Sequence, residues 1–257
     1  MCLVAIALTA HPRYPLVVAA NRDEFHDRAS RPAHWWGEGW LAGRDLTAGG
    51  TWFGARRDGR WALVTNVREP GRHDAAASSR GELPPRALAA SDLAEFVGAL
   101  RREDGRYNGY NLLAGDASGA HWTSNRHGPA RRLPAGVSTL SNAALDTPWP
   151  KTARLQEALD RWAAGGADDL EPVFSALGDR TIAPDAELPS TGVPLDRERL
   201  LSAAFIIGEA YGTRCSTILA LAGDGSARFV ERTFDRAGRA IGEVDERYEL
   251  APVLPRR

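Results

Sequence analysis

The chain has 257 residues, of which 43% are hydrophobic and 25% are charged, and its formal net charge at pH 7 is -1. This composition provides enough apolar side chains for a folded core and argues against global disorder. The balanced charge lacks the basic excess that is typical of nucleic-acid-binding proteins, so we expect no nucleic-acid partner.

Cysteine usage and hydropathy indicate the compartment. Cys2 and Cys215 form neither a CxxC pair nor a metal-ligand spacing, so we expect no disulfide framework and no structural zinc site. The opening run MCLVAIALTA lacks a preceding Lys or Arg and ends at HPR, which is not typical of a signal peptide. No later run approaches the ~20 apolar residues of a membrane span. We therefore expect a cytoplasmic protein without a membrane span, folded as one domain over residues 1–257.

The first part of the chain is predicted to form strands. The segment 2–10 is too short for a typical helix, and a turn, HPRYP, leads to a second apolar run, LVVAA, that continues into NRDE. A stretch rich in Trp, Gly and Arg follows, and the Asp-Gly step at 58–59 predicts a hairpin whose far strand is WALVTNV. Side chains alternate along a strand, so Asn66 is expected on the face opposite Trp61 and Leu63.

The middle of the chain is predicted to contain three helices and a pair of strands. The segment 67–85 reads as a loop, and a helix is predicted over 91–102, with Asp92 and Glu95 at capping-box spacing. Two strands, YNGYNLLAGD and AHWTSN, come next, and VSTLSNA precedes a turn. A helix over KTARLQEALDRWAA, between a proline and a Gly-Gly pair, and a short helix around LEPVFSAL follow. The acidic segment 179–199 reads as a surface loop.

The last third of the chain is predicted to form an antiparallel meander. Its strands would be FIIGEAYG, TRCSTILALA, ARFVERTF and IGEVDERYEL, with turns at GDGS and DRAGR. Each element must bury one apolar face, so strands at both ends with helices between them predict two sheets that carry helices on their outer faces.

The second residue suggests a nucleophile. Processing normally removes an initiator Met before a small residue, which would leave Cys2 as the first residue of the mature chain. A free α-amino group has a pKa of about 7.7 to 8.0 and a thiol about 8.5, so the amine can take the thiol proton near neutral pH. The alternative is that Cys2 is simply an apolar residue at the start of an edge strand.

The NRDE segment supplies charges that can act on this cysteine. The second strand returns beside the first, which brings Arg22 and Asp23 toward the start of the chain. A cation there would favour the thiolate, and a carboxylate would hold the ammonium group or its water.

Several motifs together resemble a known family. AANRDEF, GGTWFG, LVTN, RGEL, YNGYNLL, LSNAALDTPWP, YGTRCSTI and ERTF follow one another between Met1 and about Glu249. In this order they resemble the NRDE family, which is related to the transport and Golgi organisation 2 proteins. The resemblance implies the N-terminal nucleophile hydrolase fold, an α+β sandwich with four αββα layers made of two antiparallel sheets. It also implies a distant likeness to choloylglycine hydrolases and penicillin V acylases, which cleave amides with a terminal cysteine.

The resemblance implies a set of site residues around the cysteine. Matched motif by motif, the positions other than Cys2 are Arg22, Asp23, Asn66, Asn142 and Arg214. One departure concerns the second strand, because the acylases space their Arg and Asp as RxxD and this chain has them adjacent. The two cannot both occupy the acylase positions without a backbone adjustment, and Glu24 is an alternative to Asp23.

Each of these residues has a catalytic and a structural interpretation. Asn66 and Asn142 are candidate oxyanion donors, or else a polar strand residue and a turn-capping residue. Arg214 would neutralise developing charge or hold an anionic substrate, or else lie solvated at a strand edge. Because strand neighbours face opposite sides, Cys215 is expected to point into packing if Arg214 enters the site.

The leading function is a cysteine N-terminal nucleophile hydrolase that acts on a non-peptide C-N bond, an amide with an apolar acyl part. Four tryptophans are candidates for an acyl pocket, although core packing is the more frequent fate of tryptophan: Trp35, Trp36, Trp40 and Trp52. No cofactor or metal is expected, because the six histidines show no HExxH or i,i+4 pairing, and no GxSxG motif indicates a serine enzyme.

The alternative function is a haem- or lipid-binding or trafficking protein on the same scaffold, since a fold does not fix a function. The sequence has no CxxCH motif for covalent haem attachment, so haem would bind noncovalently, with Cys2 or a histidine as axial ligand. Such a protein tolerates a retained Met1, whereas the hydrolase does not. A structural family member without catalysis is the third possibility.

Overall fold

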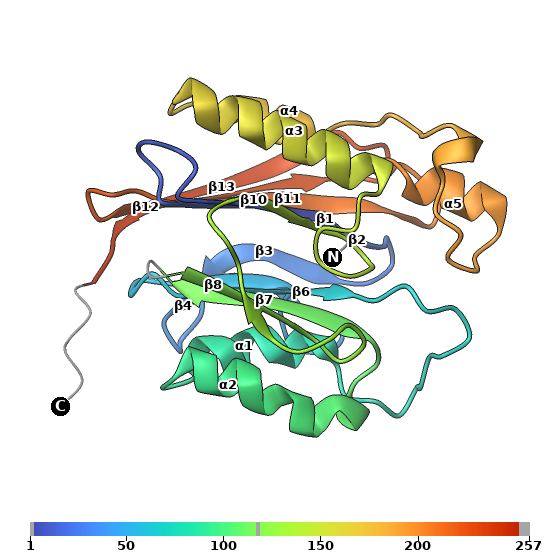
Figure 1. Ribbon diagram of the computed structural model, residues 1–257, viewed down its shortest axis with the longest axis horizontal. Coiled ribbons are helices and arrows are strands. Elements are labelled where there is room, and N and C mark those ends of the chain that lie inside the picture. Colours follow the sequence, from blue (N-terminus) through green and yellow to red (C-terminus); the bar gives the residue numbers. More distant parts are fainter. Residues whose placement is uncertain (1–2, 117–118, 252–257) are drawn as a thin grey trace.

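Two antiparallel sheets lie face to face at the centre of the molecule. The computed structural model describes residues 3–116 and 119–251. Helices cover the outer face of each sheet, so the order of layers is helix, sheet, sheet, helix (Figure 1). The four-layer αββα sandwich predicted from the sequence is confirmed.

The first sheet has six strands in the order β10-β1-β2-β11-β12-β13. Their bounds are β1 Leu3–Leu8, β2 Leu16–Phe25, β10 Gly136–Leu140, β11 Tyr211–Leu221, β12 Ser226–Phe234 and β13 Ala240–Glu249. The β1–β2 hairpin and the β11–β12–β13 meander agree with the sequence prediction, and β2 extends through the whole NRDE motif. The middle of the chain contributes only β10, which pairs with β1.

The second sheet has seven strands that follow chain order. Their bounds are β3 Ser30–Trp35, β4 Trp40–Asp45, β5 Phe53–Arg56, β6 Trp61–Asn66, β7 Tyr110–Asp116, β8 Gly119–Ser124 and β9 Arg131–Arg132. The predicted hairpin turn after Arg56 connects β5 to β6 and uses Gly59 at φ 84°, a conformation that glycine adopts without strain.

Two helices cover each sheet. On the first sheet lie α3, Pro150–Gly165, and α4, Glu171–Leu177; on the second lie α1, Leu83–Ala89, and α2, Leu93–Ala99 (Figure 1). The remaining helix, α5, spans Leu195–Leu201, and three 3-10 turns span Arg80–Glu82, Leu100–Arg106 and Asp185–Glu187. The α3 signals are confirmed, because Pro150 begins the helix and Gly166 ends it at φ 64°. None of the helices in the described part of the chain is long and apolar enough to span a membrane.

Strand alternation divides the core into three layers. On β1, Val4 and Ile6 face the second sheet, whereas Leu3, Ala5 and Ala7 face α3. On β6, Trp61 and Leu63 face the first sheet, whereas Ala62 and Val64 pack under α1. Asn66 has the same parity as Ala62 and Val64, as predicted.

Three sequence predictions of secondary structure were wrong. Helix α1 begins inside the predicted loop 67–85, because prolines are tolerated in the first helical turn, where backbone N–H groups need no helical partner. Helix α5 begins inside the predicted loop 179–199, directly after Pro194. The segment FIIGEA forms no strand, since Ile206 receives the amide of Thr213 and gives its own amide to the Thr213 hydroxyl at 2.9 Å each.

Candidate active site

The NRDE segment ends β2 with two charged side chains on opposite faces of the first sheet. Arg22 has the parity of Val18 and Ala20, which pack between the sheets, and Asp23 has the parity of Ala19, which packs under the helices. Both are almost fully buried. Adjacent residues of a strand point to opposite faces, so Arg22 and Asp23 do not pair with each other.

Arg22 lies on an aromatic surface between two carboxylates. Its guanidinium carbon is 4.4 Å from the centroid of the Trp52 ring, and its Nη2 atom is 3.9 Å from Glu24 and 3.8 Å from Asp45. Its Nη1 atom is buried and has no hydrogen-bond partner within residues 3–116 and 119–251. Burial alone would raise the pKa of Asp45, but hydrogen bonds from Arg28 and from backbone amides outweigh it and lower that pKa.

Asp23 is held on the other face by β11. The Thr213 hydroxyl donates to Asp23 Oδ1 at 2.6 Å. The same hydroxyl accepts the amide of Ile206. Asp23 therefore belongs to the contact between the first sheet and the segment that precedes β11. Glu24, which the sequence offered as its substitute, lies on the Arg22 side.

The two asparagines meet where β6 and β10 end. Asn142 Nδ2 donates to the carbonyl of Asn66 at 2.9 Å, and the carbonyl of Asn142 accepts the amide of Arg68 at 2.7 Å. This uses one of the two N–H groups of the Asn142 amide. The side chain of Asn66 makes no hydrogen bond to the described residues, so its amide group remains a donor for a ligand.

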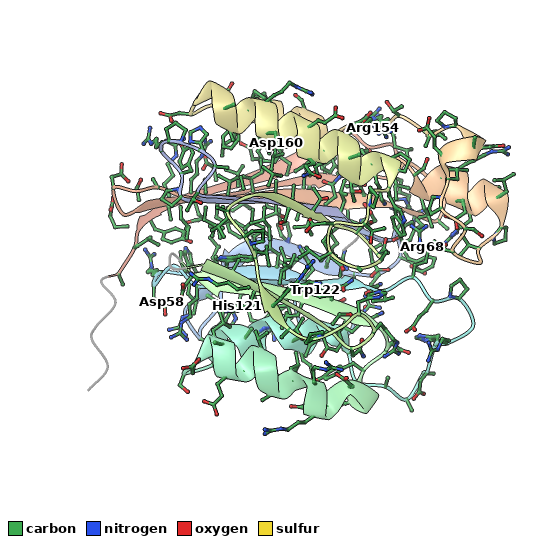
Figure 2. The ribbon with its side chains drawn as sticks, viewed as in Figure 1. Asp58, Arg68, His121, Trp122, Arg154 and Asp160 are labelled. Atoms are coloured by element: carbon green, nitrogen blue, oxygen red, sulfur yellow. The ribbon has the colours of Figure 1, made fainter. Side chains whose placement is uncertain are left out.

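A buried network fixes the segment that carries Asn142. The Thr65 hydroxyl donates to the carbonyl of Ser141 at 2.9 Å. Asn111 donates to the Thr65 hydroxyl at 3.3 Å and to the carbonyl of Ala143 at 3.0 Å. Asn111 in turn accepts the indole N–H of Trp122 at 3.2 Å, and Trp122 lies between the two sheets (Figure 2).

Two adjoining pockets surround these side chains. The Arg22 pocket, about 240 Å³, is lined by Arg22, Glu24, Trp52 and Asn66 among others. The Arg197 pocket, about 320 Å³, is lined by Asn66, Asn142, Arg197 and Tyr211 among others. Both are also lined by the same three further residues, His73, Arg80 and Asn108. The two pockets therefore adjoin, and Asn66 lies at the wall between them.

Arg214 and Cys2 are the two remaining predicted site residues. Arg214 lines neither pocket. Its Nη1 atom donates to the carbonyls of Phe25, His26 and Arg28 at 2.9, 3.2 and 3.3 Å, which holds the turn after β2. Burial, and then the charge of Arg22, lower the pKa of Arg214. Cys2 falls outside the described residues.

The tryptophans divide in the same way. Only Trp52 of the four candidates lines either of the two pockets. Trp35 packs against Tyr248 with ring centroids 5.3 Å apart, and Trp36 donates its indole N–H to the carbonyl of Ala42 at 2.9 Å. These contacts support the core interpretation for Trp35 and Trp36.

Comparison with known proteins identifies the family of the chain. Residues 1–236 match the transport and Golgi organisation 2 family. The chain belongs to this family. It is 34% identical over 260 residues to the transport and Golgi organization protein 2 homolog of Homo sapiens and 32% identical over 257 residues to that of Bos taurus. Each alignment covers 91% of this chain and 93% of the relative.

Solved structures show the fold of this transport and Golgi organisation 2 family member. A variant of the conjugated bile acid hydrolase from Clostridium perfringens matches 100% of this chain and 99% of its own length, with a TM-score of 0.50 and 11% identity. The N-terminal nucleophile hydrolase fold implied by the sequence resemblance is thereby confirmed, and at this identity the likeness concerns the fold alone.

Several residues that shape the site of this family member escaped sequence reasoning. A Cβ atom at Gly43 would lie 2.1 Å from the Trp52 ring, so glycine makes room for the ring under Arg22. A Cβ atom at Gly50 would lie 2.2 Å from the carbonyl oxygen of Gly81. The motifs GGTWFG and RGEL therefore meet at this contact, and their glycines were the signal in the sequence.

A second acidic group lies buried behind Arg22. Glu231 on β12 accepts the backbone amide of Ala33 on β3 at 2.7 Å and the hydroxyl of Thr217 at 3.1 Å, which links the two sheets. Burial raises the pKa of Glu231 and of its neighbour Cys215. Cys215 packs in the core between the sheets. No group of three or more His, Cys, Asp or Glu within the described ranges could hold a metal ion.

Proposed function

We propose that this family member is a cysteine amidohydrolase whose nucleophile is Cys2, freed by removal of Met1. The observation that carries the proposal is that Arg22, Asn66 and Asn142 line two adjoining pockets, with Asn66 in the lining of both. Strand β1 begins beside that site, because Leu3 pairs with Asn21 and Val4 pairs with Leu140. One peptide bond joins Cys2 to Leu3, and consecutive Cα atoms are only about 3.8 Å apart.

The surroundings of Arg22 favour a thiolate at this position. Its guanidinium is buried, and one nitrogen has no acceptor among the described residues. A cation near a thiol stabilises the deprotonated form and lowers the thiol pKa. The sulfur anion would in turn compensate the charge of Arg22.

The proton transfers of the reaction need no group beyond the terminal residue and water. The α-amine of Cys2 takes the thiol proton, and the thiolate adds to the carbonyl carbon of the amide to form a C–S bond. As the C–N bond breaks, the ammonium group returns the proton to the leaving amine. A water molecule then attacks the thioester while the amine takes a proton from it. As the C–S bond breaks, the ammonium group gives this proton to the sulfur, which releases the acid and restores the thiol.

The asparagine at the pocket junction suits the charged intermediate. Attack places a negative charge on the former carbonyl oxygen, and one fixed N–H donor there contributes on the order of 3 to 4 kcal/mol. The Asn66 amide bonds to none of the described residues, and Asn142 keeps a second N–H after its bond to Asn66. The bond from Asn142 to the Asn66 carbonyl also fixes the position of both groups.

Intact mass and alkylation kinetics of the purified, untagged protein test the proposal. We expect the mass of a chain that lacks Met1, and alkylation of Cys2 that persists well below the ordinary thiol pKa of about 8.5. The Cys215→Ala variant should retain this reaction, and the Cys2→Ala variant should lose it. The wild type and the Cys215→Ala variant should hydrolyse N-acyl amides, and the Cys2→Ala variant should not.

A retained Met1, or a Cys2 no more reactive than a free thiol, would contradict the hydrolase proposal. That result would favour the alternative of a haem- or lipid-binding protein on the same scaffold. Titration with haem and with fatty acids, followed by absorbance and calorimetry, would then be the next measurement.

A further inference from the structure

The two adjoining pockets differ in charge. The Arg22 pocket is balanced, since it is lined by three arginines and three carboxylates: Arg22, Arg28, Arg80, Glu24, Asp45 and Asp74. The Arg197 pocket is lined by four arginines and one carboxylate: Arg68, Arg72, Arg80, Arg197 and Glu69. The side of the site beyond Asn66 is therefore strongly cationic.

Two acidic groups near the Arg197 pocket, Glu198 and Glu69, already have partners. Glu198 accepts from Arg68 at 2.8 Å, and both side chains are nearly buried. Arg68 lies at the end of the sandwich where α5 lies (Figure 2). Glu69 accepts from Arg126 and from the amide of Gly109, at 2.8 and 2.9 Å. Burial alone would raise the pKa of Glu69, but the hydrogen bond and charge of Arg126, together with the amide of Gly109, outweigh it and lower that pKa. This carboxylate therefore stays ionised.

The positive charge that remains belongs to arginines at the wall of the pocket. Arg197 stacks over the Tyr211 ring at 5.5 Å and has no acidic group within 4.0 Å in the described part of the chain. Within the described ranges, the one carboxylate within 4.0 Å of Arg72 is that of Glu69, at 3.7 Å, and Glu69 also binds Arg126. Arginine presents a planar fork that binds carboxylates and phosphates through two hydrogen bonds.

We infer that the substrate carries an anionic substituent beside its amide bond, and that this substituent occupies the Arg197 pocket. The inference rests on the proposed function, because Asn66 places the reacting carbonyl at the junction of the two pockets. Carboxylate, sulfonate and phosphate share the required chemistry. The apolar side chains of Val67, Val193 and Leu201 line the same pocket and would contact the carbon atoms next to the charge.

Matched amides with one acyl chain test the inference. The probes are N-decanoyl glycine, N-decanoyl taurine and N-decanoyl phosphoethanolamine, against the neutral N-decanoyl ethanolamine. We expect kcat/KM to be at least tenfold higher for the best anionic probe, and this preference to shrink as salt is added, because salt screens exposed charges. The ranking of the three anions identifies which group the pocket prefers.

Arginine variants connect the preference to the pocket. In Arg72→Gln/Arg197→Gln we expect the ratio of anionic to neutral kcat/KM to fall tenfold or more, through KM. The control Arg161→Gln removes an exposed arginine on α3, whose nearest carboxylate is Glu157 at 3.7 Å, and should leave the ratio unchanged. An equal rate on all four probes, or an unchanged ratio in the double variant, would overturn the inference.

Binding to the Cys2→Ala variant separates this inference from the proposed function. Calorimetry with N-decanoyl glycine and N-decanoyl ethanolamine needs no hydrolysis. If the wild type cleaves none of the probes but this variant binds the anionic one at least tenfold more tightly, the hydrolase proposal fails and the anion site stands. Equal affinity for the two probes would remove the anion site.

Discussion

At the scale of single residues, the site is organised around Arg22. Its guanidinium is buried on the Trp52 ring, beside the carboxylates of Glu24 and Asp45. Arg28 also binds Asp45. A buried charge is retained only where packing and counter-charges offset its desolvation. Trp52 therefore stabilises the charge and fixes its position at the wall of the Arg22 pocket.

A double-mutant cycle measures this contact. Arg22→Met and Trp52→Leu should each lower the free energy of unfolding, and the double variant should lose less than the sum. The coupling expected for a desolvated cation–π pair is about 0.5 to 2 kcal/mol. Urea unfolding of the four proteins gives the value, and effects that add within about 0.3 kcal/mol would show that the two side chains are energetically independent.

The sequence named candidate residues but not their surroundings. Alternation along a strand predicted the face of Asn66, and the family motifs named Arg22 and Asn142. The position of Trp52 under Arg22 and the bonds from Arg214 to three carbonyls depend on segments that meet only after folding. No local sequence pattern predicts these contacts, because the partners are far apart in the chain and have no fixed spacing.

At the scale of elements, loops that meet at glycines form the wall of the site. The amide of Thr51 donates to the carbonyl of Gly81 at 2.9 Å, so the turn after β4 contacts the 3-10 turn before α1. Gly50 passes this carbonyl with no room for a side chain. The contact positions Gly81 and Thr51, which both line the Arg22 pocket.

Substitution at this contact should therefore affect both stability and site. We expect Gly50→Ala to lower the free energy of unfolding by about 1 to 3 kcal/mol, as for other overpacked positions, and to reduce amide hydrolysis. Gly98→Ala on α2 is the matched control, because a Cβ atom added there would meet no described atom within 4 Å and alanine favours a helix by up to about 1 kcal/mol. If the two variants unfold at the same urea concentration, the loop contact is not tight.

Element prediction failed where local signals conflict. The segment 67–85 is rich in Gly, Pro and small polar residues and reads as a loop, yet LPPRALA forms α1 because Leu83 and Leu88 pack under β6. FIIGEA has strand composition but turns back on β11 through Thr213. In both cases tertiary packing overrides intrinsic propensity.

At the scale of the whole molecule, polar groups as well as the core join the two sheets. Phe53 and Phe229 meet across the interface with ring centroids 5.6 Å apart. Glu231 of the first sheet binds the amide of Ala33 in the second. This carboxyl is almost completely buried, so its ionisation would place a charge at the contact between the two sheets.

The raised pKa of Glu231 predicts a dependence of stability on pH. The unfolded carboxyl titrates near pH 4.3, and burial moves the folded pKa above that value. Between the two the folded state binds more protons, so the contribution of this group to stability falls as pH rises through that window. The Glu231→Gln side chain cannot ionise. The free energy of unfolding of this variant, minus that of the wild type, should therefore increase as pH rises above about 4.3.

Urea unfolding between pH 4 and 7.5 provides this measurement. Burial raises the pKa of the Cys215 thiol, so this neighbour of Glu231 stays protonated across the range. A difference between variant and wild type that does not change with pH would mean that Glu231 keeps an ordinary pKa.

The strand order also sets a sequence of events during synthesis. The second sheet uses one continuous stretch, residues 30–132, whereas the first needs residues 3–25, 136–140 and 211–249. On the ribosome, the second sheet can therefore assemble before β11 has been synthesised. Until then the β1–β2 hairpin lacks β11, which pairs with β2 along its whole length. Pairing between such distant segments is slow, and until it occurs β1 and β2 expose apolar faces. We expect nascent chains that stop before β11 to depend on chaperones.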